Sequence, residues 1–118
     1  MAHPLEYALN GVILPNKSDS RVTEPEPGLQ REVLVHSPAM MLVRHVMKKG
    51  WEGVAHSHPH QQLVYVISGC IRVTADGTSM EASTGDNFIV ASNVTHQALA
   101  LEDSVVLDIF APAREDYL

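Results

Sequence analysis

The chain has a single cysteine, Cys70, among its 118 residues. One thiol cannot close an internal disulfide, which excludes the disulfide-stapled class of small secreted domains and is typical of a reducing compartment. The sequence also lacks a continuous apolar run of the roughly 18 residues that a membrane span needs. Its N-terminus does not show the basic segment followed by an apolar segment of a signal peptide. We therefore expect a cytoplasmic protein without a membrane partner.

Positive charge is scarce as well. Eight Lys and Arg residues stand against fourteen Asp and Glu residues, for a net charge of -6, and the largest basic cluster is the pair Lys48-Lys49. Proteins that bind nucleic acid present a basic patch or stripe. The composition therefore argues against a nucleic-acid partner and leaves a small-molecule substrate open.

The spacing of apolar residues shows no clear amphipathic helix. The sequence contains instead about nine short strand-like segments separated by turn signals. Ser37-Pro38 separates Arg31–His36 from Met40–Met47, and Asp76-Gly77 is a strong hairpin signal. Such regular short strands predict an all-β sandwich or barrel.

The length fits a single domain with one hydrophobic core. We expect residues 1–28 to form an N-terminal arm with an edge strand and residues 29–118 to form the domain proper. Within the arm, Thr23–Gly28 is predicted to be a loop, because Pro25 and Pro27 remove backbone donors.

The chemistry is expected in the stretch from Gly50 to Gly69, which carries several histidines before an apolar run. Neutral imidazole is the commonest protein ligand for transition metals. His56 and His58 alternate, so an extended strand would project both from one face, and we expect both residues to lie on a sheet. Leu63–Ile67 is rich in β-branched and aromatic residues, which favours a strand.

This stretch resembles the first motif of the cupin superfamily, and residues 85–96, GDNFIVASNVTH, resemble the second. Three positions depart from the usual motifs: Gln62 replaces Glu, Ala91 replaces Pro and Asn93 replaces Gly. With the C-terminal FAPAREDYL, the chain is most similar to the small cupins of pectin and alginate breakdown that linearise unsaturated uronates, in which Gln is the norm. The resemblance implies a single-domain cupin jelly-roll β-barrel of the RmlC-like type, with residues 29–118 as the cupin domain.

The resemblance also implies a metal site for one divalent transition metal ion (Ni, Zn, Fe or Mn), with ligands His56, His58, Gln62 and His96. An alternative is a metal-free cupin in which these side chains only form hydrogen bonds. A neutral amide ligand leaves the ion its full charge, which would favour an anionic oxygen ligand. His60 follows Pro59 at an expected bend, and we expect it to lie outside the ligand set.

A second group of candidates lies near the C-terminus. Asp108 and Phe110 share one face of the last predicted strand. By the resemblance, Asp108 and Arg114 would be catalytic, and Phe110 and Arg114 would bind substrate. The alternatives are that Asp108 is a surface charge and that Arg114 pairs with Glu115 or Asp116 on the surface. His45, on a predicted strand, is interpreted as packed or surface-facing.

The leading functional hypothesis is metal-dependent opening of the ring of 4,5-unsaturated monouronates, an enzymatic isomerisation without redox change. Two alternatives remain open: a cupin dioxygenase that uses iron, and a non-catalytic cupin that binds a sugar acid or another small ligand. The expected partners are an anionic sugar and, by family analogy, a second copy of the chain in a homodimer.

Overall fold

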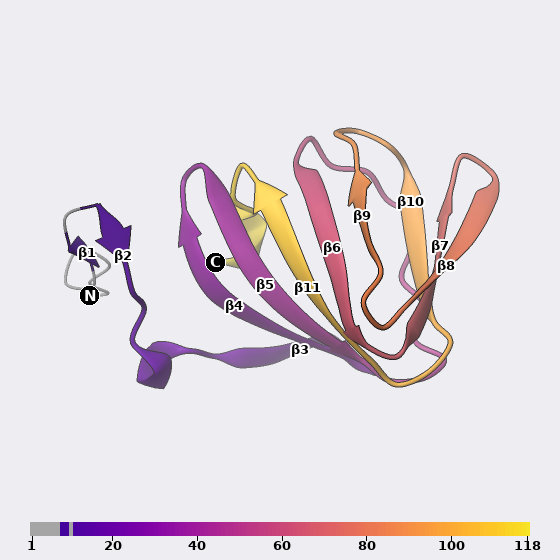
Figure 1. The fold of residues 1–118 in the computed structure, drawn as a ribbon, viewed down its shortest axis with the longest axis horizontal. Coiled ribbons are helices and arrows are strands. Elements are labelled where there is room, and N and C mark those ends of the chain that lie inside the picture. The colour runs from indigo at the N-terminus through magenta and orange to yellow at the C-terminus, as the bar shows by residue number, and fades with distance from the viewer. Residues whose placement is uncertain (1–7, 10) are drawn as a thin grey trace.

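The structure is a computed structural model that describes residues 8–9 and 11–118, and its regular elements are strands and two short 3₁₀ turns (Figure 1). The described part holds no helix that is both long enough and apolar enough to cross a membrane. The strands are β1 (Ala8–Leu9), β2 (Val12–Ile13), β3 (Val22–Glu26), β4 (Leu29–Ser37), β5 (Met40–Met47), β6 (Gln61–Ser68), β7 (Cys70–Ala75), β8 (Thr78–Ser83), β9 (Asn87–Val90), β10 (His96–Ala100) and β11 (Ser104–Ala111), and the 3₁₀ turns are η2 (Lys17–Asp19) and η3 (Glu115–Tyr117).

Two antiparallel sheets make up the barrel. The larger sheet has the order β3-β4-β5-β11-β6-β9, and the smaller has the order β10-β7-β8. Inward side chains of both sheets form the main core, in which each fully buried aliphatic side chain contributes about 1.5–3 kcal/mol. The predicted all-β cupin jelly roll is confirmed. The core residues are Leu29, Met47, Val64, Val66, Ile71, Val73, Ala82, Ala100 and Val106.

Tight turns connect the strands where the sequence predicts them. The hairpin between β7 and β8 turns at Asp76 and Gly77, whose φ angles of 52° and 74° suit a two-residue hairpin loop. Gly69, between β6 and β7, has a φ of 95°, and a Cβ there would lie 2.3 Å from Oγ of Ser104. Only glycine therefore fits at this corner.

The expectation of a loop over Thr23–Gly28 is wrong for its first four residues. β3 covers Val22–Glu26 and pairs with β4 at the edge of the larger sheet. Pro25 is tolerated because an edge strand needs no donor on its free side, and because the register shifts between Thr23 and Glu26.

The N-terminal strands β1 and β2 pair with each other and lie apart from the barrel (Figure 1). Residues 1–7 and 10, where part of the predicted arm falls, lie outside the described residues.

The histidine stretch is extended but does not form a continuous strand. The expectation that both residues lie on a sheet is met by His56 only through an isolated bridge to β10, and it is wrong for His58. This stretch runs beside β10 and meets it in two isolated bridges, Glu52 with Leu99 and His56 with His96. Three residues separate the bridges on one side and two on the other, so a regular ladder cannot form. The bridge between His56 and His96 nevertheless brings both imidazoles together.

Candidate metal centre and acid–base site

Three histidines converge at one end of the barrel. His56 and His58 lie on the connection between β5 and β6, and His96 is the first residue of β10. One ring nitrogen from each lies within 4.8 Å of the others, and the ring centroids are 4.6 to 5.4 Å apart. His58 and His96 are buried, whereas His56 is exposed.

The hydrogen bonds of these rings fix their tautomers. Nδ1 of His56, His58 and His96 each lies 2.9 to 3.0 Å from a backbone carbonyl oxygen, of Val54, His60 and Val94 respectively. A carbonyl oxygen only accepts, so each Nδ1 carries the proton and donates. Each neutral ring therefore keeps its Nε2 lone pair free, as in most metal-binding histidines.

Burial keeps two of these rings neutral. Desolvation lowers the pKa of both His58 and His96 below the usual histidine value, and for His58 the charge of Arg114 adds to this effect. A neutral imidazole is the form that can coordinate a metal.

Gln62 adds an oxygen to the cluster. It lies on β6, and its Oε1 is 3.1 Å from Nε2 of His58, while its Nε2 donates to Oδ1 of Asp108 over 2.8 Å. Because Nδ1 of His58 holds the ring proton, Nε2 of His58 and Oε1 of Gln62 face each other as two acceptors. Two acceptors at this distance fit a cation between them. The set of three imidazoles and one amide oxygen thus fits a borderline divalent transition metal.

Asp108 faces the barrel interior with 3% of its surface exposed, so the alternative of a surface charge is excluded. Its Oδ2 lies 2.6 Å from Nδ1 of His45 on β5. Nε2 of the same ring accepts from Nε of Arg31 at 3.1 Å. Sequence reasoning missed His45 and Arg31, although the position of His45 among the inward residues of β5 was the available signal.

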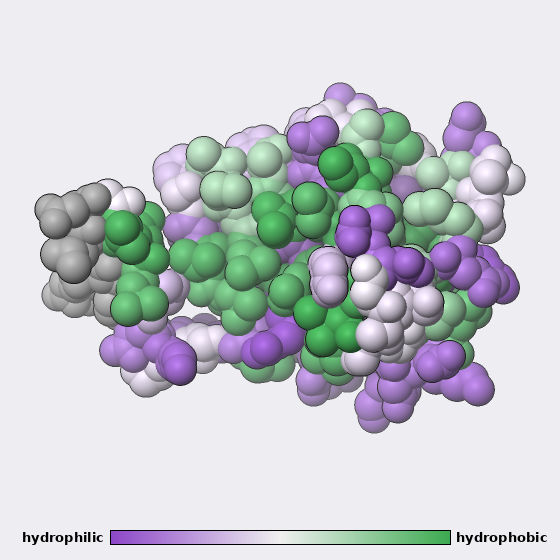
Figure 2. Space-filling model, viewed as in Figure 1, coloured by the Kyte–Doolittle hydropathy of each residue, from purple (hydrophilic) through white to green (hydrophobic). Residues whose placement is uncertain are grey.

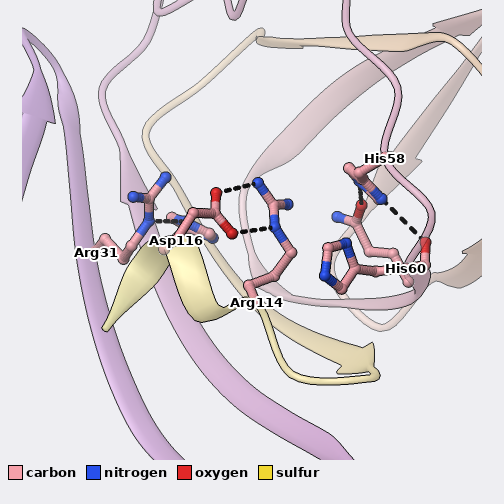
Figure 3. Close-up of polar contacts among 7 residues, drawn as sticks. Arg31, His58, His60, Arg114 and Asp116 are labelled. Atoms are coloured by element: carbon pink, nitrogen blue, oxygen red, sulfur yellow. Dashed lines mark hydrogen bonds and ion pairs between the residues drawn. The ribbon is translucent and has the colours of Figure 1, made fainter.

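Arg114 has 9% of its surface exposed and forms a two-pronged pair with Asp116, of 3.0 and 2.8 Å (Figure 3). The pairing of Arg114 with Asp116, which was the alternative to a role in the site, therefore exists, but the guanidinium that forms it is buried. Its Cζ stacks 4.4 Å from the Tyr117 ring centroid and 5.1 Å from that of Phe110. Its Nη1 is buried without a hydrogen-bond partner, so one donor is left for a ligand.

One cavity of about 290 Å³ joins these groups. Its wall combines apolar side chains of the core with histidines and with charged groups. The structure brings all the predicted site residues to this cavity wall except His58, whose ring packs edge to face with Phe110 at a centroid distance of 5.8 Å. Those at the wall are His56, Gln62, His96, Asp108, Phe110 and Arg114, joined by Arg31, His45 and Tyr117.

Comparison with known proteins agrees with this geometry. Residues 43–110 match the family described as cupin domain. The pectin degradation protein KdgF of Dickeya dadantii (strain 3937) is 34% identical over 93 residues, which cover 77% of this chain and 84% of that protein.

Solved structures show the same likeness over more of the chain. KdgF from Halomonas sp. is 36% identical, with a TM-score of 0.82 over 89% of this chain and 97% of the other. An RmlC-like cupin from Shewanella frigidimarina NCIMB 400 is 32% identical, with a TM-score of 0.82 over 89% of this chain and 95% of the other. The chain therefore belongs to the cupin domain family, within which it is similar to the pectin degradation protein KdgF.

Proposed function

We propose that this protein is an enzyme of pectin or alginate breakdown that opens the ring of 4,5-unsaturated monouronates to the linear keto form, with a divalent metal ion held by His56, His58, Gln62 and His96. The observation that carries the proposal is the Gln62 side chain. Its oxygen faces Nε2 of His58 and its nitrogen donates to the buried Asp108. Gln62 thereby connects the proposed ion site to Asp108, the proposed proton-transfer group, at the wall of one cavity.

The four proposed ligands are all neutral, so the ion would keep its charge of about +2. When bound, such an ion would act as a Lewis acid on ring or carboxylate oxygens of the sugar. The donor set suits Ni, Zn, Fe or Mn, and elemental analysis distinguishes among them.

Asp108 is proposed to move the proton. Its carboxylate would accept the proton of the anomeric hydroxyl as the C1–O5 bond breaks and C1 becomes an aldehyde. The ring oxygen stays on C5 as an enolate, and return of that proton from Asp108 to C4 gives the keto group at C5. Atoms and electrons balance within the sugar, so no co-substrate is needed. Such acid–base catalysis contributes about 10²- to 10⁴-fold to a rate.

Arg114 and Phe110 are proposed to bind the substrate. The unpartnered Nη1 of Arg114 offers a hydrogen bond to the uronate carboxylate, and the pair with Asp116 holds the guanidinium in place. Phe110, which is 1% exposed, would form the wall against the sugar.

A homodimer is proposed through the outer face of the larger sheet. Figure 2 shows apolar residues over the region in which Figure 1 draws β4, β5 and β11. The strand register places Ile89, Leu63, Ile109 and Leu42 in one row across four strands on this face. Leu63 and Ile89 are exposed, and sedimentation of Leu63→Glu against the unaltered chain tests whether they pack against a second copy.

The proposed function is tested by elemental analysis of the purified protein and by the ultraviolet absorbance of unsaturated galacturonate and mannuronate. We expect metal-dependent loss of absorbance that Asp108→Ala abolishes while the metal content stays near normal. The exposed acid Glu102 provides a matched control, Glu102→Gln. Full activity of Asp108→Ala would remove Asp108 from the mechanism. Oxygen consumption with bound iron would support a dioxygenase, and thermal stabilisation by uronates without turnover would support a binding protein.

A further inference from the structure

We infer that His45 is a positioning residue that holds the carboxylate of Asp108 in its reactive orientation. The inference rests on the proposed function, since Asp108 is there the group that moves the proton. His45 belongs to neither the proposed ligand set nor the proposed substrate contacts.

The location of His45 is unusual for a histidine. The inward positions of β5 are Met41, Val43, His45 and Met47, so the ring is the one polar group in an apolar row, and it is 8% exposed. β5 pairs with β11, which carries Asp108. The imidazole lies outside the three-histidine cluster. The acidic group that it contacts is the carboxylate of Asp108.

Both ring nitrogens have partners, and these partners fix where the proton lies. The guanidinium of Arg31 can only donate, so Nε2 of His45 accepts from it at 3.1 Å. The proton of the neutral ring is therefore on Nδ1, which donates to Oδ2 of Asp108 at 2.6 Å. Arg31 in turn stacks 3.6 Å from the ring centroid of Tyr117, which limits its movement. Figure 3 shows Arg31 on the side of Asp116 and Arg114 that faces away from His58 and His60.

Asp108 thus receives one hydrogen bond on each oxygen, from Gln62 at Oδ1 and from His45 at Oδ2. Of the two donors, Gln62 also lies beside His58 of the proposed ion site, and His45 also accepts from Arg31. Two such bonds fix the plane of the carboxylate and leave a lone pair on each oxygen for the substrate proton. Misplacement of a reacting group by about 1 Å can cost about 10²-fold in rate, so the second donor matters for turnover.

The test compares two substitutions of His45 in the metal-loaded protein. Asparagine carries a donor nitrogen one bond from Cγ, as Nδ1 is, whereas leucine fills similar space without a donor. We expect His45→Leu to lower kcat by about 10- to 100-fold, with KM for unsaturated galacturonate and the metal content nearly unchanged. His45→Asn should recover most of that loss. Wild-type kcat in His45→Leu, or an equal loss in both variants, would overturn the inference.

A second measurement does not depend on turnover. Nitrogen chemical shifts of the ¹⁵N-labelled protein distinguish a protonated ring nitrogen from one with a lone pair, and His45→Asn assigns the signal. We expect Nδ1 of His45 to be protonated and Nε2 to be unprotonated, and we expect Arg31→Leu to disturb this pattern. A proton on Nε2 would overturn the inference whether or not the protein turns over uronates. A metal-loaded wild type that leaves unsaturated uronates unchanged would instead overturn the proposed function.

Discussion

The amide nitrogen of Gln62 donates a hydrogen bond of 2.8 Å to Oδ1 of Asp108, while the amide oxygen of the same side chain lies 3.1 Å from Nε2 of His58. The amide nitrogen therefore contacts Asp108, and the amide oxygen contacts His58. A carboxylate in its place could face an ion but could not donate to Asp108. The structure thus gives a second reason for glutamine at this position, besides the charge that a neutral ligand would leave on a bound ion.

We predict that Gln62→Glu separates metal binding from turnover. A glutamate oxygen can still face the histidine nitrogens, so the metal content should be retained. Two carboxylates would then adjoin, and one of them must hold a proton or move away. We expect kcat to fall by about 10²-fold or more. Elemental analysis together with the ultraviolet assay measures both effects, and unchanged kcat would show that the bond to Asp108 is dispensable.

Much of the fold follows from local sequence signals. The structure places Met40–Met47 as a strand with the predicted bounds, and the predicted hairpin at Asp76-Gly77 joins the strands Cys70–Ala75 and Thr78–Ser83. That Asp108 and Phe110 share one face follows from the two-residue period of a strand. The resemblance implied that this face points into the barrel, and the burial of both side chains agrees with it. Motif spacing identifies the three histidines, of which His96 begins β10 whereas His56 and His58 lie outside the regular strands.

Other features depend on pairing between distant segments, which local patterns do not encode. β3 exists because β4 offers it an edge, and this outweighs the prediction from Pro25 and Pro27. His45 meets Asp108 because β5 and β11 are neighbours in the sheet although 63 residues separate the two side chains. Arg31 joins them only because β4 lies beside β5.

The ring of Tyr117 is predicted to hold two guanidinium groups in place through cation–π contacts. Arg31 lies 3.6 Å from its ring centroid and Arg114 lies 4.4 Å from it. Tyr117→Leu should lose both contacts, each worth about 0.5–2 kcal/mol, so we expect a lower melting temperature and a higher KM for the uronate. Tyr117→Phe keeps the aromatic face and serves as the control. Equal behaviour of the two variants would contradict a role for the ring.

The pair between Arg114 and Asp116 predicts a pH-dependent contribution to stability. The hydrogen bonds from Arg114 hold the pKa of Asp116 below its usual value of 3.8. A depressed pKa means that the unfolded chain binds the proton first, so the stabilisation is fully present above pH 3.8 and is lost as the pH falls through the lower folded value. Because Asp116 is largely exposed, the contribution is expected to stay at or below about 1 kcal/mol.

The measurement for this pair is the difference in free energy of urea unfolding between the wild type and Asp116→Asn, taken from pH 6 to pH 3. We expect the difference to be constant in the upper part of this range and to decrease as the pH falls below 3.8. Glu115→Gln, one residue away and exposed, controls for the loss of a charge. A difference as large at pH 3 as at pH 6 would contradict a contribution from the ionised Asp116.

His58 and His60 lie two residues apart in the same motif, yet we predict that replacing them with alanine has opposite effects on metal binding. His58 directs Nε2 to the cluster, whereas His60 contributes its backbone oxygen, which accepts from Nδ1 of His58 at 2.9 Å. His60→Ala leaves that carbonyl in place, so metal content and the thermal stabilisation by added metal should be retained. His58→Ala should lose both. At a metal concentration of 100 times Kd, the wild type should gain about 2.7 kcal/mol, and chelation should remove this gain. Equal metal loss in the two variants would place His60 among the ligands and refute the proposed ligand set.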